Sequence, residues 1–321
     1  MKVLITGAGG VVGSCLIEKL FNDGEDVLGT YFTPTTDISE INRSIRMAEC
    51  DVRDESRVNR IITEFKPDVI YHLAAQSRPP VSWEKPLETM DINVGGTINI
   101  FECIRHLKER DKNFDPVIVV ACSSAAYGET ISKLPEGTLV SEHEEFMPLS
   151  PYAVSKAGQD YLSFQYNRNY GLKTIRARIF NTTGPKKLLD VTGDLTHRAV
   201  EAKQLGQKTI KVGNLSTIRA ILDVRDLCSA LILLSKKGIA GEAYNICSKT
   251  TIVMSDIIPI IEKVLKMKLN VEVDRSLLRP SDEKLYAGDI TKLVKTTGWK
   301  QRYRYEDTVA NCVAYWQNHL K

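Results

Sequence analysis

The sequence has no long hydrophobic run and almost no excess of charge of either sign. Its longest apolar runs, such as 118–122 and 230–234, are far short of the ~20 residues that a membrane-spanning helix needs, so no membrane association is expected. The 43 Lys and Arg residues nearly balance the 40 Asp and Glu residues, which leaves a net charge of +3. This balance does not predict a nucleic-acid-binding surface, so any anion site must be local.

Paired cysteine motifs are also missing. The seven cysteines are scattered and odd in number, and none forms a Cys-x-x-Cys pair or lies near a histidine at metal-ligand spacing. Neither a disulfide scaffold nor a metal site is therefore predicted, and reduced, mostly buried thiols are expected. The first residues already begin a strand, which leaves no room for a signal peptide and predicts a cytoplasmic protein. The five histidines show no catalytic arrangement, and no role is predicted for them.

Short β-branched apolar runs alternate with stretches of helical periodicity over the first 180 residues. The predicted strands are 2–6, 26–32, 69–73, 117–121 and 174–179. The predicted helices between them are 13–22, 56–65, 95–110 and 151–170. Such alternation is typical of an α/β protein, and it predicts a doubly wound Rossmann fold in which helices cover a parallel sheet.

The pattern changes after residue 180, where turn-rich segments separate isolated helices. The predicted helices in this part are 191–205, 224–235 and 255–265, and a short strand at 243–247 is expected to return to the main sheet. We therefore predict a Rossmann domain over 1–180, to which 223–247 returns. A smaller, interleaved α/β lobe for the substrate is predicted over 181–222 and 248–321.

A glycine-rich turn directly follows the first predicted strand. Gly7, Gly10 and Gly13 form a G-x-x-G-x-x-G motif, and Val11 and Val12 lie between the last two glycines. Glycines allow a tight turn and let the backbone approach a pyrophosphate, which then binds the N–H groups at the positive end of the helix dipole. Because the turn stands between a strand and a helix, it predicts a site for NAD(P).

Further cofactor contacts are predicted where the strands of such a sheet end. Asp51 and Val52 follow a short run and are candidates for contact with the adenine ring. Ala74 and Ala75 are small residues at a point where the backbone must pass near the cofactor. Asn93 opens a helical segment, and two interpretations are equally open: a cofactor contact or a plain N-cap.

The end of the second predicted strand lacks the carboxylate that often selects NAD. An acidic residue is usual ~20 residues past the fingerprint, whereas residues 30–33 here are Thr-Tyr-Phe-Thr. Nothing in this segment would repel a 2′-phosphate, and Arg43 or Arg46 could neutralise one. The sequence therefore favours NADP(H) over NAD(H), with use of both cofactors expected.

The segment Ser150-Pro151-Tyr152-Ala-Val-Ser-Lys156 predicts a hydride-transfer site. Serine as N-cap and proline at the first helical position start a helix, so Tyr152 and Lys156 lie one turn apart on one face. A lysine ammonium near the phenol is expected to lower the pKa of the tyrosine and make it a usable acid or base. The same lysine can hold the nicotinamide ribose. Ser123 ends the strand that begins at 117, and its hydroxyl can bind the reacting oxygen.

The motifs TGAGGVVG, SSAAYG, SPYAVSK, RIFNTTGP, DVRD and LRPSD, in this order, resemble those of extended short-chain dehydrogenase/reductases that modify nucleotide sugars. The similarity covers nearly the whole chain and is greatest to the group of GDP-mannose 4,6-dehydratase and GDP-6-deoxy-D-mannose reductase. The resemblance implies a catalytic triad of Ser123, Tyr152 and Lys156. It also implies a homodimer built through helices of the first domain, and a nucleotide-diphosphate sugar, GDP-linked, as substrate.

The resemblance further implies which residues bind the nucleotide sugar. These are Ser124, Asn181, Arg219 and Arg279. A guanidinium can bind a diphosphate through two parallel hydrogen bonds, which suits the two arginines. Family members usually continue Arg-Asp-Phe at the first of them, whereas this chain has Arg219-Ala-Ile. Lys186 and Lys187 could also help to bind the diphosphate, although a solvated loop pair is the favoured interpretation.

One departure from the family pattern bears on the reaction. Dehydratases of this group resemble Thr-Ser-Glu-x-Tyr-Gly where this chain has Ala125 at the glutamate position, and alanine offers no carboxyl group for the elimination. The leading prediction is NAD(P)H-dependent reduction of a nucleotide 4-keto-6-deoxy sugar at C4, with Tyr152 as general acid. The alternatives, in order, are a C4 epimerase or C4 dehydrogenase, a GDP-mannose 4,6-dehydratase, and a non-catalytic NAD(P)-sensing protein.

Overall fold

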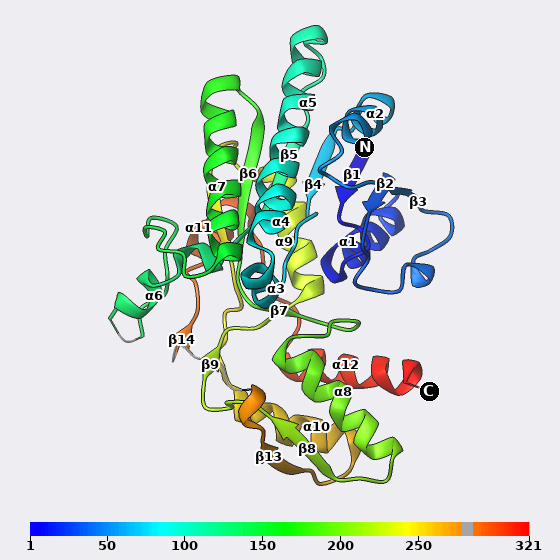
Figure 1. Ribbon diagram of the computed structural model, residues 1–321, viewed down its shortest axis with the longest axis vertical. Coiled ribbons are helices and arrows are strands. Elements are labelled where there is room, and N and C mark those ends of the chain that lie inside the picture. Colours follow the sequence, from blue (N-terminus) through cyan, green and yellow to red (C-terminus); the bar gives the residue numbers. More distant parts are fainter. Residues whose placement is uncertain (136, 278–284, 321) are drawn as a thin grey trace.

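A seven-stranded parallel sheet forms the centre of the molecule (Figure 1). The computed structural model describes residues 1–135, 137–277 and 285–320. The strands of the sheet are β1 (Lys2–Thr6), β2 (Asp26–Tyr31), β3 (Arg46–Glu49), β4 (Val69–His72), β5 (Val117–Ser123), β6 (Lys173–Ile179) and β11 (Ala243–Ile246). They lie in the order β11-β6-β5-β4-β1-β2-β3, and every neighbouring pair is parallel. The predicted doubly wound fold is confirmed.

Helices cover both faces of this sheet. One face is covered by α2 (Glu55–Phe65), α5 (Gly96–Arg110) and α7 (Pro151–Tyr170). The other face is covered by α1 (Val11–Asn22), α9 (Val224–Lys237) and α11 (Thr291–Thr297). Side chains alternate along β1, so Val3 and Ile5 join the core on one side and Leu4 the core on the other. All four residues of β4 are buried, which explains why such strands are apolar without alternation.

Most elements after β6 form a second lobe below the sheet in Figure 1. They include α8 (Val191–Gln204), β8 (Thr209–Val212), α10 (Ile257–Leu265), β13 (Asn270–Val273) and α12 (Tyr305–His319). Strands β8 and β13 pair in parallel, and the three helices share a core of their own that contains Ala199, Ile261 and Val313. Helix α12 and strand β3 are not among the elements predicted from the sequence. The domain boundaries stay predictions, although β11 does pair with β6 in the main sheet.

Shorter elements connect these parts. Strand β7 (Thr182–Thr183) pairs with β10 (Leu222–Asp223), and β9 (Ile218–Arg219) lies between β12 (Ile252–Val253) and β14 (Leu285–Tyr286). The short helices are α3 (Pro79–Glu84), α4 (Pro86–Met90) and α6 (Thr130–Lys133), and a π-helical turn at Asp91–Gly95 leads into α5. Within the described ranges, no helix combines the length and apolar character needed to cross a membrane.

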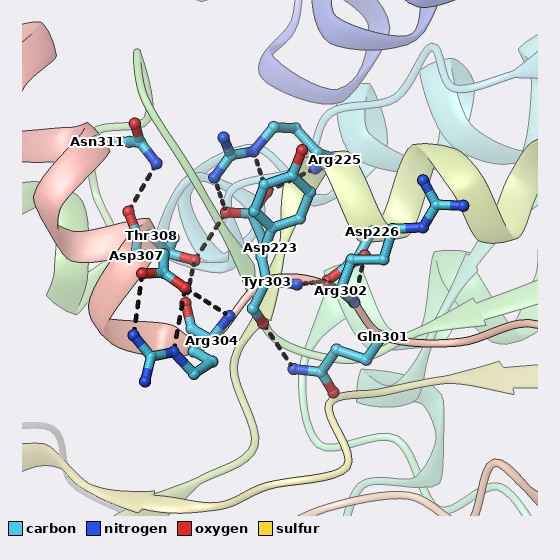
Figure 2. A network of polar contacts seen from close by, with 10 residues as sticks. All are labelled: Asp223, Arg225, Asp226, Gln301, Arg302, Tyr303, Arg304, Asp307, Thr308 and Asn311. Atoms are coloured by element: carbon cyan, nitrogen blue, oxygen red, sulfur yellow. Dashed lines mark hydrogen bonds and ion pairs between the residues drawn. The ribbon is translucent and has the colours of Figure 1, made fainter.

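Two buried aspartates join the start of α9 to the chain that leads into α12, an arrangement that we call the clasp (Figure 2). Asp223 caps α9 by accepting the Arg225 N–H at 2.8 Å, and its carboxylate also accepts the Thr308 hydroxyl at 2.7 Å. The Arg225 guanidinium pairs with Asp223 at 2.7 Å and lies 3.6 Å from the centroid of the Tyr303 ring. The Arg225 side chain therefore has a structural role in the clasp.

Asp226 forms the second half of the clasp. Its carboxylate accepts the backbone N–H of Arg302 at 3.0 Å and that of Tyr303 at 2.9 Å. The main-chain carbonyl of Asp226 accepts the Trp299 indole N–H at 3.2 Å. The side chain is 1% exposed, and burial raises its pKa. A single carboxylate thus fixes the segment on which α12, and with it the core of the second lobe, depends.

We predict that Asp226→Asn lowers the free energy of unfolding by about 1–3 kcal/mol, because one of the two acceptor oxygens becomes a donor that faces backbone donors. Urea denaturation measured by circular dichroism would check this. Glu109→Gln is the control, since Glu109 makes a surface ion pair with Arg105 at 2.7 Å and its loss should leave the midpoint nearly unchanged. Equal midpoints for the two variants would contradict a structural role for the clasp.

Candidate active site

The carboxyl ends of β1, β4, β5 and β6 meet at one edge of the sheet, because all four strands are parallel. The strand order reverses between β1 and β4, and open α/β sheets bind their ligands at such a point. The residues that follow these four strands at this edge are Gly7, Leu73, Ser124 and Phe180. The predicted site segments at Gly7, Ala74, Ser124 and Asn181 therefore begin within a few residues of the same edge.

The glycine turn leaves no room for side chains. Gly7 has a φ of +74°, and a Cβ on it would lie 2.7 Å from the backbone nitrogen of Ala74. A Cβ on Gly13 would lie 2.2 Å from the carbonyl oxygen of Gly7, so the start of α1 packs directly against the turn. Gly10 closes the turn by donating its N–H to Gly7 at 3.1 Å. A bare backbone followed by the N–H groups that begin α1 fits a dinucleotide pyrophosphate.

The loop after β2 is fastened to this turn through Gly9, which the sequence analysis did not single out. The Gly9 carbonyl accepts the N–H groups of Thr35 at 3.0 Å and Thr36 at 3.1 Å, and a Cβ on Gly9 would lie 2.9 Å from Pro34. The segment predicted to select between NAD and NADP therefore lies beside the glycine turn.

The structure separates the two arginines proposed for a 2′-phosphate. Arg46 begins β3 opposite Leu28, at the amino ends of the strands, where it pairs with Asp26 and lies 5.1 Å from the centroid of the Phe65 ring. Cofactors bind at the carboxyl ends, so the prediction for Arg46 is wrong. Arg43 is exposed in the loop that follows β2 and stays a candidate.

The other predicted cofactor residues differ in their surroundings. Asp51 is half-buried, and its ion pair with Arg53 at 2.6 Å, together with hydrogen bonds from that residue, lowers its pKa against the effect of burial. Val52 is 4% exposed and packs beneath α5, so its side chain belongs to the core and only its backbone could face an adenine. Ala74 and Ala75 are half-buried, and the Ala74 N–H donates to the Thr6 hydroxyl at 3.2 Å.

Asn93 is not an N-cap. It lies within the π-helical turn before α5, is completely buried, and bonds the backbone of Gln76 twice: its oxygen accepts the N–H at 2.8 Å, and its amide donates to the carbonyl at 3.0 Å. The amide also lies 2.8 Å from the Ser155 hydroxyl, one residue before Lys156. Asn93 therefore joins the segment after β4 to helix α7.

Helix α7 presents the predicted tyrosine and lysine. The Ser150 hydroxyl accepts the Ala153 N–H at 3.1 Å, and Pro151 occupies the first helical position, as predicted. Lys156 Nζ lies 5.9 Å from the centroid of the Tyr152 ring. The ammonium donates to the Ala121 carbonyl of β5 at 2.9 Å, which ties the helix to the sheet beside Ser123.

Burial dominates the electrostatics of these groups. It raises the pKa of Tyr152, and a hydrogen bond with the Ser123 hydroxyl offsets only part of that rise. Burial lowers the pKa of Lys156 to about 8. The lowering of the tyrosine pKa that we predicted from the neighbouring lysine is therefore wrong for this structure. Ser123 also accepts the Ala125 N–H at 3.1 Å, which fixes its hydroxyl at the end of β5.

The residues predicted to bind the nucleotide sugar differ in their surroundings. Asn181 is exposed directly after β6, at the same edge of the sheet. Ser124 is 3% exposed, and its hydroxyl donates to the Ile179 carbonyl at 3.1 Å, which does not favour the predicted substrate contact. Arg219 is half-buried in β9, where one guanidinium nitrogen donates to the Ile218 carbonyl at 3.1 Å. Arg279 lies outside the described residues.

The two lysines after β7 are engaged rather than solvated. Lys186 pairs with Glu40 of the loop after β2 at 2.7 Å, and Lys187 pairs with Asp190 at 3.2 Å. The interpretation as a solvated loop pair is therefore wrong. Over the part of the chain that the structure describes, no cluster of three or more His, Cys, Asp or Glu side chains could hold a metal ion.

Three further residues at this site escaped the sequence analysis. His72, Thr97 and Gln159 are at most 1% exposed and lie behind Lys156. A buried histidine at a strand end and a glutamine three residues after the lysine are the signals that could have identified them.

The chain is similar to known proteins over most of its length. The family model described as GDP-mannose 4,6 dehydratase matches residues 4–312. GDP-6-deoxy-D-mannose reductase of Pseudomonas aeruginosa is 27% identical over 259 residues, which cover 79% of this chain and 82% of the relative.

Two solved structures share the architecture. RMD from Pseudomonas aeruginosa complexed with NADPH matches with a TM-score of 0.81 and 25% identity, over 99% of each chain. UDP-glucose 4-epimerase of Thermus thermophilus, in complex with NAD, matches with a TM-score of 0.84 and 25% identity, over 98% of this chain and 99% of that one. The family match across nearly the whole chain shows that it belongs to the GDP-mannose 4,6 dehydratase family of extended short-chain dehydrogenase/reductases, which are NAD(P)-dependent enzymes.

Proposed function

We propose that this enzyme reduces the C4 carbonyl of a GDP-linked 4-keto-6-deoxy sugar, with Tyr152 as general acid. The observation that carries the proposal is the geometry where the end of β5 meets the start of α7: Ser123 interacts with Tyr152 there, and Lys156 Nζ lies 5.9 Å from the centroid of the Tyr152 ring. The Pseudomonas aeruginosa relative, named GDP-6-deoxy-D-mannose reductase, supports the choice of reaction and of nucleotide.

The state of Tyr152 suits the reductive direction. Because burial raises its pKa, the phenol keeps its proton at neutral pH and can give it to the oxygen of a carbonyl that is being reduced. Ser123 holds that same oxygen beside the phenol. Lys156 donates a hydrogen bond to the cofactor ribose, and its positive charge stabilises the negative charge on Tyr152 after proton transfer. When bound at the glycine turn, the reduced nicotinamide supplies the hydride.

Ala125 argues against a dehydratase. Elimination needs a carboxyl group to move protons at the sugar ring, and the side chain at this position has none. A C4 epimerase is the second candidate, because the same Ser123, Tyr152 and Lys156 would serve it and a UDP-glucose 4-epimerase shares the fold with a TM-score of 0.84. An epimerase retains its cofactor through the cycle, so NAD that survives purification would favour that candidate.

The seven free thiols are compatible with work in the reducing cytoplasm.

The proposed reaction is tested with a panel of GDP-, dTDP- and UDP-linked 4-keto-6-deoxy sugars. With the GDP-linked sugar we expect oxidation of NADPH, followed as loss of absorbance at the nicotinamide band, and a C4 alcohol as product by NMR. Oxidation of reduced cofactor with none of the sugars would refute the proposal.

We predict that Tyr152→Phe lowers kcat by about 10²–10⁴-fold, because the general acid is removed while the ring still fills its place. The Kd for NADPH, measured by fluorescence titration, should stay within a factor of a few. A variant with undiminished turnover would exclude Tyr152 as the proton donor. In the wild type at saturating cofactor, kcat for reduction should fall as pH rises and the phenol ionises, whereas kcat for the reverse oxidation should not.

We also propose a preference for NADPH over NADH. Tyr31 ends β2 where a carboxylate would select NAD, and the loop that carries Arg43 is fastened to the glycine turn through Gly9. The structure of RMD with NADPH is compatible with this preference.

Arg43→Gln should raise the KM for NADPH about tenfold and leave that for NADH unchanged, since only the former carries a 2′-phosphate. Arg46→Gln is the matched control, because Arg46 pairs with Asp26 at the opposite edge of the sheet. Steady-state kinetics with both cofactors would check this. A wild-type enzyme that prefers NADH would contradict the proposal.

Finally, we propose that the enzyme is a homodimer through the outer face of α7. Apolar side chains stand exposed along this helix: Val154 at 44%, Tyr161 at 58% and Phe164 at 40%. An apolar stripe of this kind on a long helix is typical of a protein–protein interface.

Tyr161→Glu should convert the dimer to a species near the chain mass of 36.0 kDa in light scattering coupled to size exclusion, because a carboxylate would be buried in the interface. Leu205→Glu is the control, since Leu205 is 65% exposed at the end of α8 in the other lobe. A wild-type protein that is monomeric at micromolar concentration would refute the interface.

A further inference from the structure

A continuous row of buried polar side chains runs from Lys156 to the strand that precedes the glycine turn. Lys156 Nζ donates to Gln159 Oε1 at 2.7 Å, and Gln159 Nε2 donates to Thr97 Oγ1 at 2.8 Å. His72 Nε2 lies 2.9 Å from the same Thr97 oxygen, and His72 Nδ1 lies 2.9 Å from Thr6 Oγ1. The five side chains, which we call the polar row, are at most 5% exposed. They come from α7, α5, β4 and β1.

The hydrogen positions along the polar row follow from counting donors and acceptors. Thr97 donates its single hydroxyl hydrogen to the Asn93 carbonyl at 2.6 Å, so its oxygen must accept from both Gln159 and His72. His72 therefore carries its proton on Nε2, and Nδ1 accepts the hydroxyl of Thr6. Burial lowers the pKa of His72 to about 3, which agrees with a neutral ring.

This assignment fixes the amide of Gln159. Its NH2 group must face Thr97, which has no hydrogen left to give, so its oxygen must face Lys156. A lysine ammonium has three donors. One is taken by Gln159 and one by the Ala121 carbonyl at 2.9 Å, which leaves the third for a ligand on the side of Tyr152.

We propose that Gln159 is a positioning residue: the polar row holds its amide oxygen against Lys156 and so keeps that lysine charged and aimed at the cofactor. The proposal extends the function proposed above, on which the role of Lys156 rests. Gln159 itself touches neither of the reacting groups and acts through the lysine alone.

The titratable groups around Lys156 leave its positive charge to be stabilised by Gln159. Cys122 faces it from β5, His72 from β4, and Tyr152 and Asp160 lie on α7 itself. His72 is neutral, the thiol and the phenol keep their protons because burial raises the pKa of each, and Asp160 is paired with two arginines of β6. Gln159 is therefore the side chain that stabilises the ammonium directly.

The first test uses the protein without cofactor or substrate. The pKa of Lys156 is about 8 in the folded chain, below its ordinary value of 10.5, so the stability that this group contributes rises as pH increases from about 8 towards 10.5. In Gln159→Met the charged form loses an acceptor. We expect the melting temperature to fall at pH 7 and the difference from wild type to shrink above pH 8, where the amine is neutral in both proteins.

Ser163→Ala is the matched control. Ser163 is completely buried one turn further along α7, and its hydroxyl donates to the main-chain carbonyl of Gln159 rather than to the polar row. Its deficit in melting temperature should be the same at every pH. A deficit of Gln159→Met that is equally independent of pH would mean that Gln159 only fills space, and the proposal would fall.

The second test measures the Kd for NADPH against pH by fluorescence. Binding should weaken as Lys156 loses its proton, and in Gln159→Met this loss should move about one pH unit lower, the effect of one charge-assisted hydrogen bond. Thr97→Val should move the pH at which binding is lost in the same direction, and Thr97→Ser should keep it at the wild-type value. The role of the polar row is therefore tested even if the methionine variant does not fold. An unmoved profile in Thr97→Val and in any folded Gln159→Met protein would overturn the proposal. A wild type that binds no NADPH would instead refute the proposed function, and the melting test would still decide the role of Gln159.

Discussion

A buried ammonium group sets the requirement that the surrounding structure has to meet. Lys156 is 4% exposed, and burying a charged amine without acceptors would cost on the order of several kcal/mol. Its two acceptors come from different places, the Ala121 carbonyl of β5 and the Gln159 side chain of α7. The Ala121 carbonyl can reach it only if the helix keeps a fixed position over the sheet. The Ser150 cap and the bonds of Asn93 to neighbouring segments supply that constraint.

The glycine turn likewise fixes the position of α1, which covers the opposite face of the sheet. Since a Cβ at Gly13 would lie 2.2 Å from the Gly7 carbonyl, α1 starts where the backbone of the turn ends, and its N–H groups face the carboxyl edge. The same edge is held against the second lobe by Lys186, which pairs with Glu40 of the loop after β2, and by the clasp at Asp223 and Asp226. The loop after β2 and the second lobe are thus tied together at residues far apart in the sequence.

The parts predictable from sequence are those in which neighbouring residues carry the signal. Strands buried on both faces, the glycine motif and the cap of α7 all lie within short segments. Strand β3 lies at the sheet edge and has no buried residue, so no apolar run marks it. Arg46 was misplaced because distance along the chain does not tell which end of a strand a side chain occupies. Gln159 was missed because its partner, Thr97, comes from another helix. The N-cap interpretation of Asn93 was wrong because its partners, Gln76 and Ser155, lie in other segments of the chain.

The error in the predicted tyrosine pKa is more instructive, because it bears on mechanism. A lysine one turn away was expected to lower that pKa, yet burial acts on both groups and drives each towards its neutral form. Tyr152 therefore holds its proton more firmly than usual, while Lys156 releases its own near pH 8. The group in this site that is sensitive to pH near neutrality is thus the lysine. Because Gln159 accepts a hydrogen bond from the charged form of Lys156, its removal is expected to change the pH response of the site near neutrality, where the phenol keeps its proton.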